Sequence, residues 1–214
     1  MRGNATWIRP WSALIAAAAL APAASASLLS FESIAGTEGL GAYHGTMEWI
    51  CPKKDDSECG TLLVTLTNDS PVGNGGFLTG FAFNVLDGLT LTYQPDSESL
   101  GQGWQHIFDV DAPPFDMFDF GAALGGSWIG GGNPTNGIAV GDTKVFAFEV
   151  CGSPEFLCSV DVFDFFDESG GYGFVARFMG FDDEGSDKVP AVTPGPGALA
   201  LAVIAGIAGR RRSR

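Results

Sequence analysis

The chain has 214 residues, including 25 acidic and 11 basic ones, which gives a formal net charge of −14. All 25 acidic residues lie between residues 27 and 190, beside only five basic ones, so this segment carries a net charge of −20. A field of this sign repels nucleic acid and anionic lipid, which excludes nucleic-acid binding and favours solubility and cation binding.

Residues 1–26 have the three parts of a secretory signal peptide. Arg2 and Arg9 precede an apolar segment, and an Ala-Ser-Ala sequence of small residues follows it. We therefore expect cleavage before Ser27 and export of the chain to an oxidising compartment.

The next segment, residues 27–188, has a length that suits one domain with a sizeable core. It shows alternation of apolar and polar residues with a period of two, and it lacks long amphipathic helical patterns. In residues 60–68 the alternation places Leu62, Val64 and Leu66 on the inner face. Residues 77–85 and 89–93 alternate in the same way.

The Asp87-Gly88 pair between those two runs predicts a β-hairpin. Further strands are expected at residues 104–110, 144–150, 160–166 and 173–181. Residues 111–137 are expected to be irregular, because Pro113-Pro114 and many glycines disfavour a central strand there.

Seven or so short strands separated by turns predict an all-β fold, an antiparallel β-sandwich of the jelly-roll or Ig-like type. The 17 phenylalanines are expected to lie mostly in its core. The acidic and polar run at residues 182–189 predicts that the domain ends near Lys188.

The four cysteines form two close pairs in the sequence, Cys51 with Cys59 and Cys151 with Cys158. Export favours disulfides, for which three connectivities are possible, and we favour local pairing because each bond would close one short excursion. A zinc site is the alternative, although neither pair has the short spacing typical of zinc ligands.

Clusters of acidic residues are the most suggestive chemical feature, since Ca²⁺ prefers six to eight oxygen ligands from loops. A solvated surface that keeps the domain soluble is the alternative, and the first cluster does not fit an EF-hand loop. The candidates for calcium are Asp109, Asp111, Asp116 and Asp119; two further clusters comprise Asp161, Asp164, Asp167 and Glu168, and Asp182, Asp183, Glu184 and Asp187.

Catalytic motifs are missing from the sequence. His44 and His106 are the only histidines, and neither lies in a nucleophile or zinc-protease motif. A glycosidase that uses paired carboxylates has no recognisable spacing in sequence and stays open. Trp104, Trp128 and Tyr93 are candidates for stacking on sugar rings, with core or loop packing as the alternative.

The tail, residues 189–214, combines a Pro/Gly stretch, an apolar run from Gly197 to Gly209 and an arginine-rich end. As a helix the apolar run would rise only about 20 Å, against a hydrocarbon core of about 30 Å. The basic residues that follow favour retention on the cytoplasmic side; they are Arg210, Arg211, Arg212 and Arg214. We interpret this order of motifs as a sorting signal. The alternative is a plain single-pass anchor or a buried Ala-rich helix that ends in a basic tail.

This order of motifs resembles the C-terminal sorting signal of bacterial PEP-CTERM surface proteins, the substrates of exosortases. In that family a Pro-Glu-Pro motif precedes the helix; here Pro194, Gly195 and Pro196 occupy the corresponding positions. The phrases LTGFAFNV, SWIGGGNPTNGIAVGDT, KVFAFEV and FVARFMGF are also similar to body segments of exported proteins with this tail. The resemblance implies an exosortase-like partner, transient membrane association, and a β-rich domain of no established activity.

We therefore expect a non-enzymatic, exported cell-surface or matrix protein with a structural or adhesive role and no required cofactor. The alternatives are a calcium-stabilised carbohydrate-binding module, with an extracellular polysaccharide as partner, and a secreted glycosidase.

Overall fold

A computed structural model describes residues 26–52, 58–166, 171–183 and 185–193. The predicted signal peptide before Ala26 and the sorting residues from Pro194 to Arg214 lie outside the described residues. Eleven strands account for most of the described chain: β1 (Ala26–Ser33), β2 (Tyr43–Ile50), β3 (Cys59–Asn68), β4 (Gly75–Phe83), β5 (Thr90–Gln94), β6 (Trp104–Asp111), β7 (Met117–Leu124), β8 (Ile138–Ala139), β9 (Thr143–Cys151), β10 (Phe174–Phe181) and β11 (Ser186–Val192).

Helical structure in the described residues is confined to short segments. They are α1 (Ser97–Gln102), α2 (Pro154–Leu157) and three 3₁₀ turns, η1 (Val72–Asn74), η2 (Pro134–Asn136) and η3 (Val162–Phe165). No helix within these described ranges is long and apolar enough to cross a membrane.

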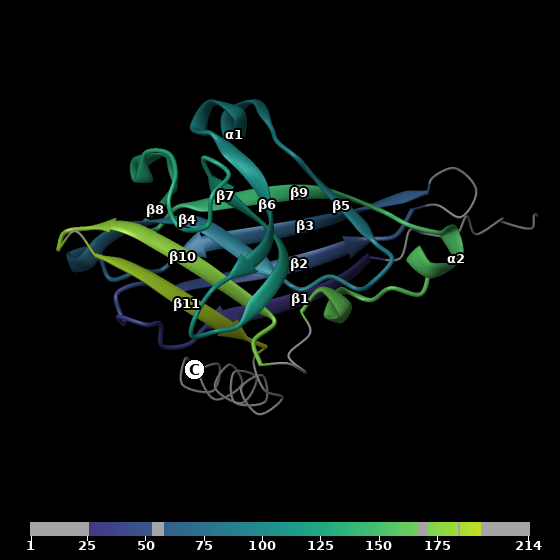
Figure 1. Ribbon diagram of the computed structural model, residues 1–214, viewed down its shortest axis with the longest axis horizontal. Coiled ribbons are helices and arrows are strands. Elements are labelled where there is room, and N and C mark those ends of the chain that lie inside the picture. Colours follow the sequence, from purple (N-terminus) through teal and green to yellow (C-terminus); the bar gives the residue numbers. More distant parts are fainter. Residues whose placement is uncertain (1–25, 53–57, 167–170, 184, 194–214) are drawn as a thin grey trace, which may run out of the picture.

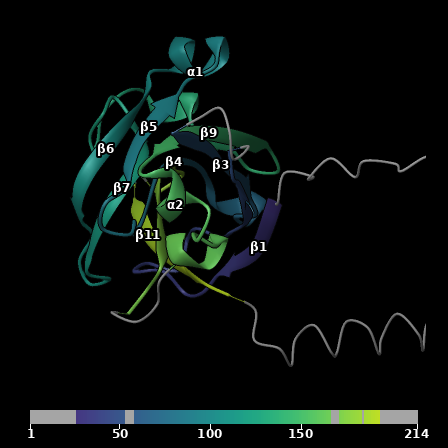
Figure 2. The ribbon, with the colours of Figure 1, turned by 90° about the vertical axis from the view of Figure 1, so that its right-hand side faces the viewer.

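All strands join one antiparallel sheet in the order β5-β9-β3-β2-β1-β11-β10-β4-β7-β6, with β8 paired to β4 (Figure 1). The sheet curls into a nearly closed, barrel-like shape, with β6, β7 and β11 opposite β1, β3 and β9 in the end view of Figure 2. One half of the sheet runs from β5 to β1 and the other from β11 to β6. The two halves meet at a short seam, where β1 and β11 share only the pairs Glu32↔Val192 and Ser33↔Ala191. Pro190 has no N–H to extend this ladder, and its carbonyl accepts a single further bond from Ile34 N.

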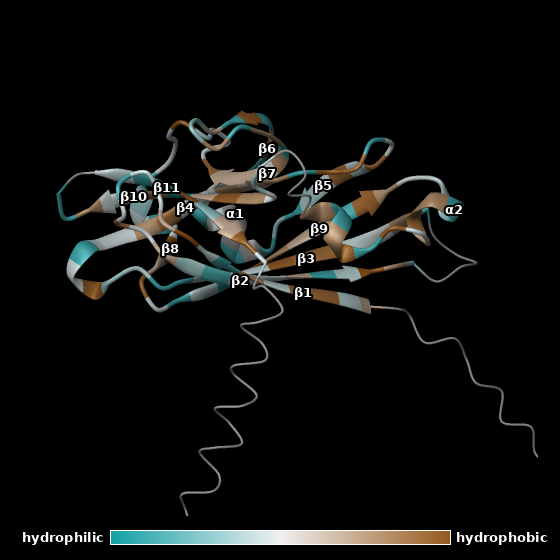
Figure 3. Cartoon of the chain, turned by 90° about the horizontal axis from the view of Figure 1, so that it is seen from below, coloured by the Kyte–Doolittle hydropathy of each residue, from teal (hydrophilic) through white to brown (hydrophobic). Residues whose placement is uncertain are grey.

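Apolar side chains that alternate along the strands fill the interior, and Figure 3 shows brown and paler bands alternating along β1, β2 and β3. Leu62, Val64 and Leu66 of β3 are fully buried, as their spacing predicts. Most of the 17 phenylalanines are also buried, and several form one continuous group of rings: Phe31, Phe81, Phe83, Phe120, Phe146, Phe148 and Phe174. The all-β, antiparallel class is therefore confirmed.

A second, smaller apolar cluster packs separately from this interior. It comprises Ala82, Ile107, Val110, Ala112, Phe115, Phe118, Ala123, Trp128 and Val175, with Tyr172 packed against it. Its members come from β4, β6, β7 and β10 and from the segments between strands, so long connections are anchored by their own hydrophobic contacts.

The predicted hairpin at Asp87-Gly88 is wrong. A turn is present, with Leu89 N donating to Leu86 O, but β4 pairs with β7, β8 and β10 whereas β5 pairs with β9. The turn therefore carries the chain from one half of the sheet to the other, and distant strands supply the hydrogen-bond partners.

Three other expectations differ from the structure. The run at residues 160–166 contains η3 in place of a strand, because Asp161 and Asp164 form a capping box that satisfies the backbone at its start. The region expected to be irregular contains β7, a central strand. The domain does not end near Lys188, since β11 continues to Val192 with Val189 and Ala191 fully buried.

Gly121 explains how β7 fits between β4 and β6. A Cβ atom at this position would lie 2.0 Å from the carbonyl oxygen of Phe81 on β4, so only glycine allows this approach. The following residues are small or apolar and buried without alternation, which hides the strand from a search for a period of two.

Candidate functional site

Strand β6 ends the sheet path, and β7 is its one partner among the described strands. The strand is irregular at Asp109, which has a positive φ of 49°, and the register passes from Phe108↔Phe120 directly to Val110↔Phe118. Ile107 and Val110 consequently both enter the smaller apolar cluster, although they are three residues apart. Such an irregularity on an edge strand redirects side chains and is common near binding sites.

An exposed aromatic pair, His106 and Phe108, lies beside this irregularity. Phe108 is 57% exposed, which is unusual in a chain whose phenylalanines mostly fill the core. Its ring centroid lies 5.1 Å from that of His106 and 5.2 Å from that of buried Phe120. Phe108 is therefore held in place from below by Phe120 while it faces solvent.

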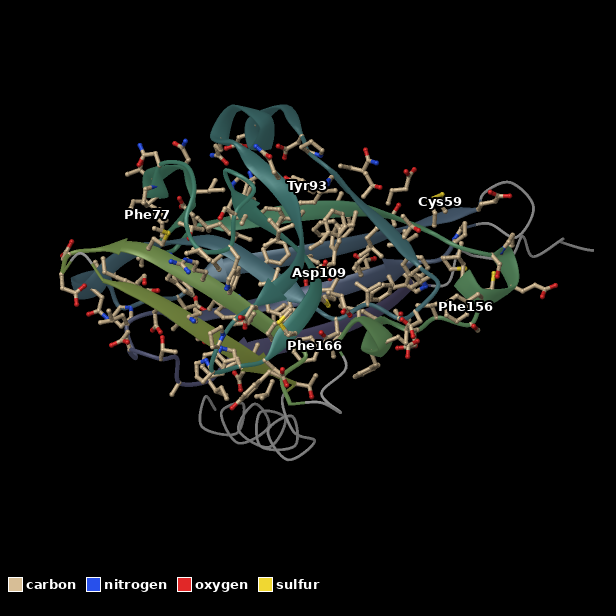
Figure 4. The ribbon with its side chains drawn as sticks, in the orientation of Figure 1. Cys59, Phe77, Tyr93, Asp109, Phe156 and Phe166 are labelled. Atoms are coloured by element: carbon tan, nitrogen blue, oxygen red, sulfur yellow. A yellow bond between two sulfur atoms is a disulfide. The ribbon has the colours of Figure 1, made fainter. Side chains whose placement is uncertain are left out.

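A groove of about 450 Å³ runs between β6 and the loop that follows β7. Its lining residues are His106 to Asp111 on the strand and Gly126 to Ile129 on the loop. Gly126 adopts a φ of 67°, and a Cβ there would lie 2.7 Å from Oε1 of Gln105, so glycine allows the loop to approach the strand. Asp109 marks this part of β6 in Figure 4.

The chemistry of the groove combines apolar surface with negative charge. Ile129 is 81% exposed, Trp128 is mostly buried in the wall, and Asp109 and Asp111 are exposed carboxylates. No lysine or arginine lines it. Apolar faces together with a few oxygen acceptors suit a ligand that presents both C–H and O–H groups, such as a sugar.

The predicted calcium ligands are only partly brought together. Asp109 and Asp111 line the groove, whereas Asp116 Oδ1 accepts a hydrogen bond from Met117 N at 3.0 Å and Asp119 Oδ2 accepts one from Val85 N at 2.8 Å. Among the described residues, the only group of three or more possible metal ligands within 4.8 Å of one another is Cys59, Glu149 and Cys151. The four aspartates thus form no compact cage.

The aromatic candidates for sugar stacking lie mostly inside the protein. Trp104 is 2% exposed and Tyr93 5%, and both rings pack against Phe146. These two residues belong to the core, and only Trp128 reaches the groove. The exposed aromatic residue of the site is instead Phe108, which the sequence hides among many core phenylalanines; the broken alternation of QHIFDVD is the signal that could have found it.

The two histidines, His44 and His106, contact different residues and do not form a shared site. His44 Nδ1 contacts Asp69 Oδ2 at the solvent-exposed surface, whereas the ring of His106 lies tilted against that of Phe108. Exposed pairs of this kind contribute little to stability.

The third acidic cluster contains a buried structural carboxylate. Asp187 is 1% exposed. Its Oδ1 accepts from Thr37 Oγ1 at 2.9 Å and Glu38 N at 3.0 Å, and its Oδ2 accepts from Leu40 N at 2.8 Å and Gly41 N at 3.0 Å. Burial acts to raise the pKa of Asp187, but these four hydrogen bonds outweigh it and lower the pKa below its ordinary value.

The cysteines do not pair locally as predicted. A disulfide joins Cys59 to Cys151, which are direct register partners on β3 and β9 with Cα atoms 4.0 Å apart. Strand pairing brings these two positions together across 92 residues of sequence, and local spacing does not reveal that contact. Cys51 and Cys158 carry free thiols. With Cys59 and Cys151 bonded to each other, their sulfur atoms no longer offer a zinc site beside Glu149.

A second hollow of about 500 Å³ lies between α1 and the start of β9. Charged and polar groups line it, including Asp96, Asp142 and Lys144, but no aromatic residue does. Lys144 Nζ already donates to Gln102 Oε1 at 3.1 Å. The β6 groove therefore has the better combination of stacking surface and acceptors.

Comparisons of the chain with protein-family models, with curated proteins and with solved structures found no match.

Proposed function

We propose that the protein is an exported cell-surface or matrix protein, in which the sheet domain has a structural or adhesive role and no catalytic activity. An export machinery would recognise residues 1–26, and an exosortase-like enzyme would act at Pro194, Gly195 and Pro196. The finer fold type that we propose is a sandwich of the jelly-roll or Ig-like kind, with the β1–β11 seam along one edge.

The observation that carries this proposal is the Cys59–Cys151 disulfide between two neighbouring central strands. Protein disulfides persist in exported proteins and are rare in the reducing cytosol. The position of the sheet adds support, because β1, from Ala26, and β11, to Val192, overlap the predicted processing segments, residues 1–26 and 189–214, by only one and four residues.

Fractionation of cells that express the precursor with an internal epitope tag tests the proposal. We expect tagged protein at the cell surface or in the medium, shortened at its N-terminus. An intact product confined to the cytosol would contradict the proposal. A matched precursor with Arg2 and Arg9 changed to glutamate, which disrupts the basic start of the signal peptide, should stay in the cytosol.

A second candidate function is carbohydrate binding at the β6 groove, and exposed Phe108 between His106 and two carboxylates favours it. Sugar rings present apolar C–H faces that pack on aromatic rings, and their hydroxyls donate to carboxylates. Pull-down on insoluble cellulose, chitin and xylan tests this function. Retention that is lost in Phe108→Ala supports it, and no retention on any of the three counts against it.

A glycosidase is the least supported alternative. Asp109 and Asp111 both line the groove, but each is exposed, whereas the acid of such a pair works from apolar surroundings. Reducing-sugar assays on the same three polysaccharides, with the Asp109→Asn variant as control, separate binding from hydrolysis.

A further inference from the structure

The free thiols of Cys51 and Cys158 lie together at one end of the sheet. Cys51 directly follows β2 and Cys158 directly follows α2, yet their Sγ atoms are 3.5 Å apart. This is the end at which Cys59 joins Cys151, and Figure 4 shows Cys59 at the same end of the molecule as Phe156 of α2.

Packing holds both cysteine backbones in place. Residues just before Cys51 are fixed by register, since Trp49 pairs with Leu62 and Ile50 with Thr61, and the Trp49 side chain is 2% exposed. Leu157, next to Cys158, is fully buried in the main core. The carbonyl oxygen of Leu157 lies 3.8 Å from Cys51 Sγ, so the two segments are in direct contact.

We propose that Cys51 and Cys158 form a second disulfide, which clamps α2 onto the end of β2 in the mature protein. A disulfide bond is about 2.0 Å long, so the sulfur atoms, now 3.5 Å apart, need to approach by about 1.5 Å through side-chain rotation. Residues 52–58 separate Cys51 from Cys59, and residues 152–157 separate Cys151 from Cys158. The two disulfides would therefore link the residues that flank one segment to those that flank the other.

The burial of the two thiols indicates the order of reaction. Cys158 is exposed, whereas Cys51 is only partly exposed, and burial first, then the hydrogen bond and charge of Cys158, raise the pKa of Cys51 to about 11. Thiolates, and not thiols, attack disulfides. Cys158 is therefore the residue that meets the oxidant.

The oxidant is a disulfide, either of a small molecule or of an oxidoreductase in the export compartment. The Cys158 thiolate attacks it, forms a mixed disulfide and releases one thiol of the oxidant. Cys51 then loses its proton, attacks Cys158 Sγ and releases the second thiol. The two cysteines lose two electrons and two protons in total, and the oxidant disulfide gains them as two thiols.

Peptide mapping of the purified, folded domain tests the pairing. The protein is incubated with oxidised glutathione, its remaining thiols are alkylated, and it is digested without reduction by enzymes that cleave after Lys or Arg and after Glu. Cleavage after Lys54 and Glu58 separates Cys51 from Cys59, and cleavage after Glu155 separates Cys151 from Cys158.

We expect one cross-linked peptide pair containing Cys51 and Cys158 and another containing Cys59 and Cys151. Alkylated Cys51 and Cys158 in protein that retains the Cys59–Cys151 bond would overturn the proposal, as would a Cys51–Cys59 or Cys151–Cys158 product. The assay uses purified protein, so a cytosolic location would contradict the proposed function without changing this result.

Thermal unfolding gives an independent readout. Oxidised wild type should melt on the order of 5–10 °C above the Cys51→Ser/Cys158→Ser variant, because the extra bond restricts the unfolded chain. After full reduction the two proteins should melt within about 1–2 °C of each other, since serine replaces the thiol conservatively. Equal melting temperatures before reduction would contradict the clamp.

Discussion

The hydrogen bonds of Asp187 lead to a prediction about stability that can be worked out from the structure. In Asp187→Asn, an NH₂ group replaces one carboxylate oxygen. This group cannot accept hydrogen bonds from the two donors that face it. Whichever way the amide is turned, either Thr37 and Glu38 or Leu40 and Gly41 lose their acceptor. Each lost bond to a charged acceptor costs roughly 1–3 kcal/mol. For two lost bonds we expect a total loss of about 2–6 kcal/mol, and a larger loss for Asp187→Ala, which removes all four bonds.

The assay is urea unfolding of the oxidised domain at neutral pH, followed by tryptophan fluorescence. Asp183→Asn is the matched control, because Asp183 precedes the same strand but is exposed and accepts one bond from Gly185 N. The control should change the free energy of unfolding by about 0.5 kcal/mol or less. If Asp187→Asn behaves like this control, the carboxylate does not anchor residues 37–41 and the reasoning is refuted.

The lowered pKa of Asp187 also fixes the sign of a pH effect. Its folded pKa lies below the unfolded value, so its stabilisation is complete above the unfolded pKa and is lost as the pH falls through the folded pKa. Wild type should therefore lose more stability than Asp187→Asn between neutral pH and the acid range below the ordinary carboxyl pKa. Parallel pH profiles for the two proteins would contradict this.

Further predictions concern packing, the groove and metal binding. Gly121→Ala should destabilise the domain by more than about 3 kcal/mol in urea unfolding, because of the contact with Phe81 O, whereas Gly101→Ala, with open space around it, should be neutral or slightly stabilising. Phe108→Ala should change the free energy of unfolding by no more than about 0.5 kcal/mol, because Phe108 is exposed, and should weaken polysaccharide retention at least about tenfold. Phe120→Ala, at a buried position, should lower the free energy of unfolding by about 3–5 kcal/mol. EDTA or millimolar Ca²⁺ should shift the melting temperature by less than about 1 °C, because the four aspartates of the β6–β7 hairpin form no cage; a clear rise with Ca²⁺ would restore the calcium site.

Strands with regular alternation could be predicted from the sequence because a single face decides their burial. β3 and β9 are examples, since Leu62, Val64, Phe146 and Phe148 all point into the core as their spacing predicts. β7 could not be found in this way, because both of its faces are covered and Gly121 serves a close approach that only the fold creates.

Strand partners and site geometry depend on contacts between distant residues. The turn at Asp87-Gly88 is locally correct, but the hydrogen bonds of β4 and β5 go to strands far along the chain. The same holds for Cys59, whose partner is 92 residues away, and for Asp187, whose donors lie about 150 residues earlier. Residue type alone placed Asp187 in an acidic surface cluster, whereas the structure brings residues 37–41 against its carboxylate.

Only part of the candidate site could be predicted from the sequence. Asp109 and Asp111 could be chosen from the sequence as exposed acidic residues, and they do share the groove. The positive φ of Asp109 and the approach of the 126–129 loop are backbone features that shape the groove, and residue type alone does not reveal them.

The central claim is that this disulfide-bonded sheet domain works outside the cytosol. Mass spectrometry of the protein isolated from the surface and culture medium of its native host tests the claim most directly. We predict a chain that begins at Ser27 and carries an intact Cys59–Cys151 disulfide. A protein found only in the cytosol, beginning at Met1 and with both cysteines reduced, would contradict the account.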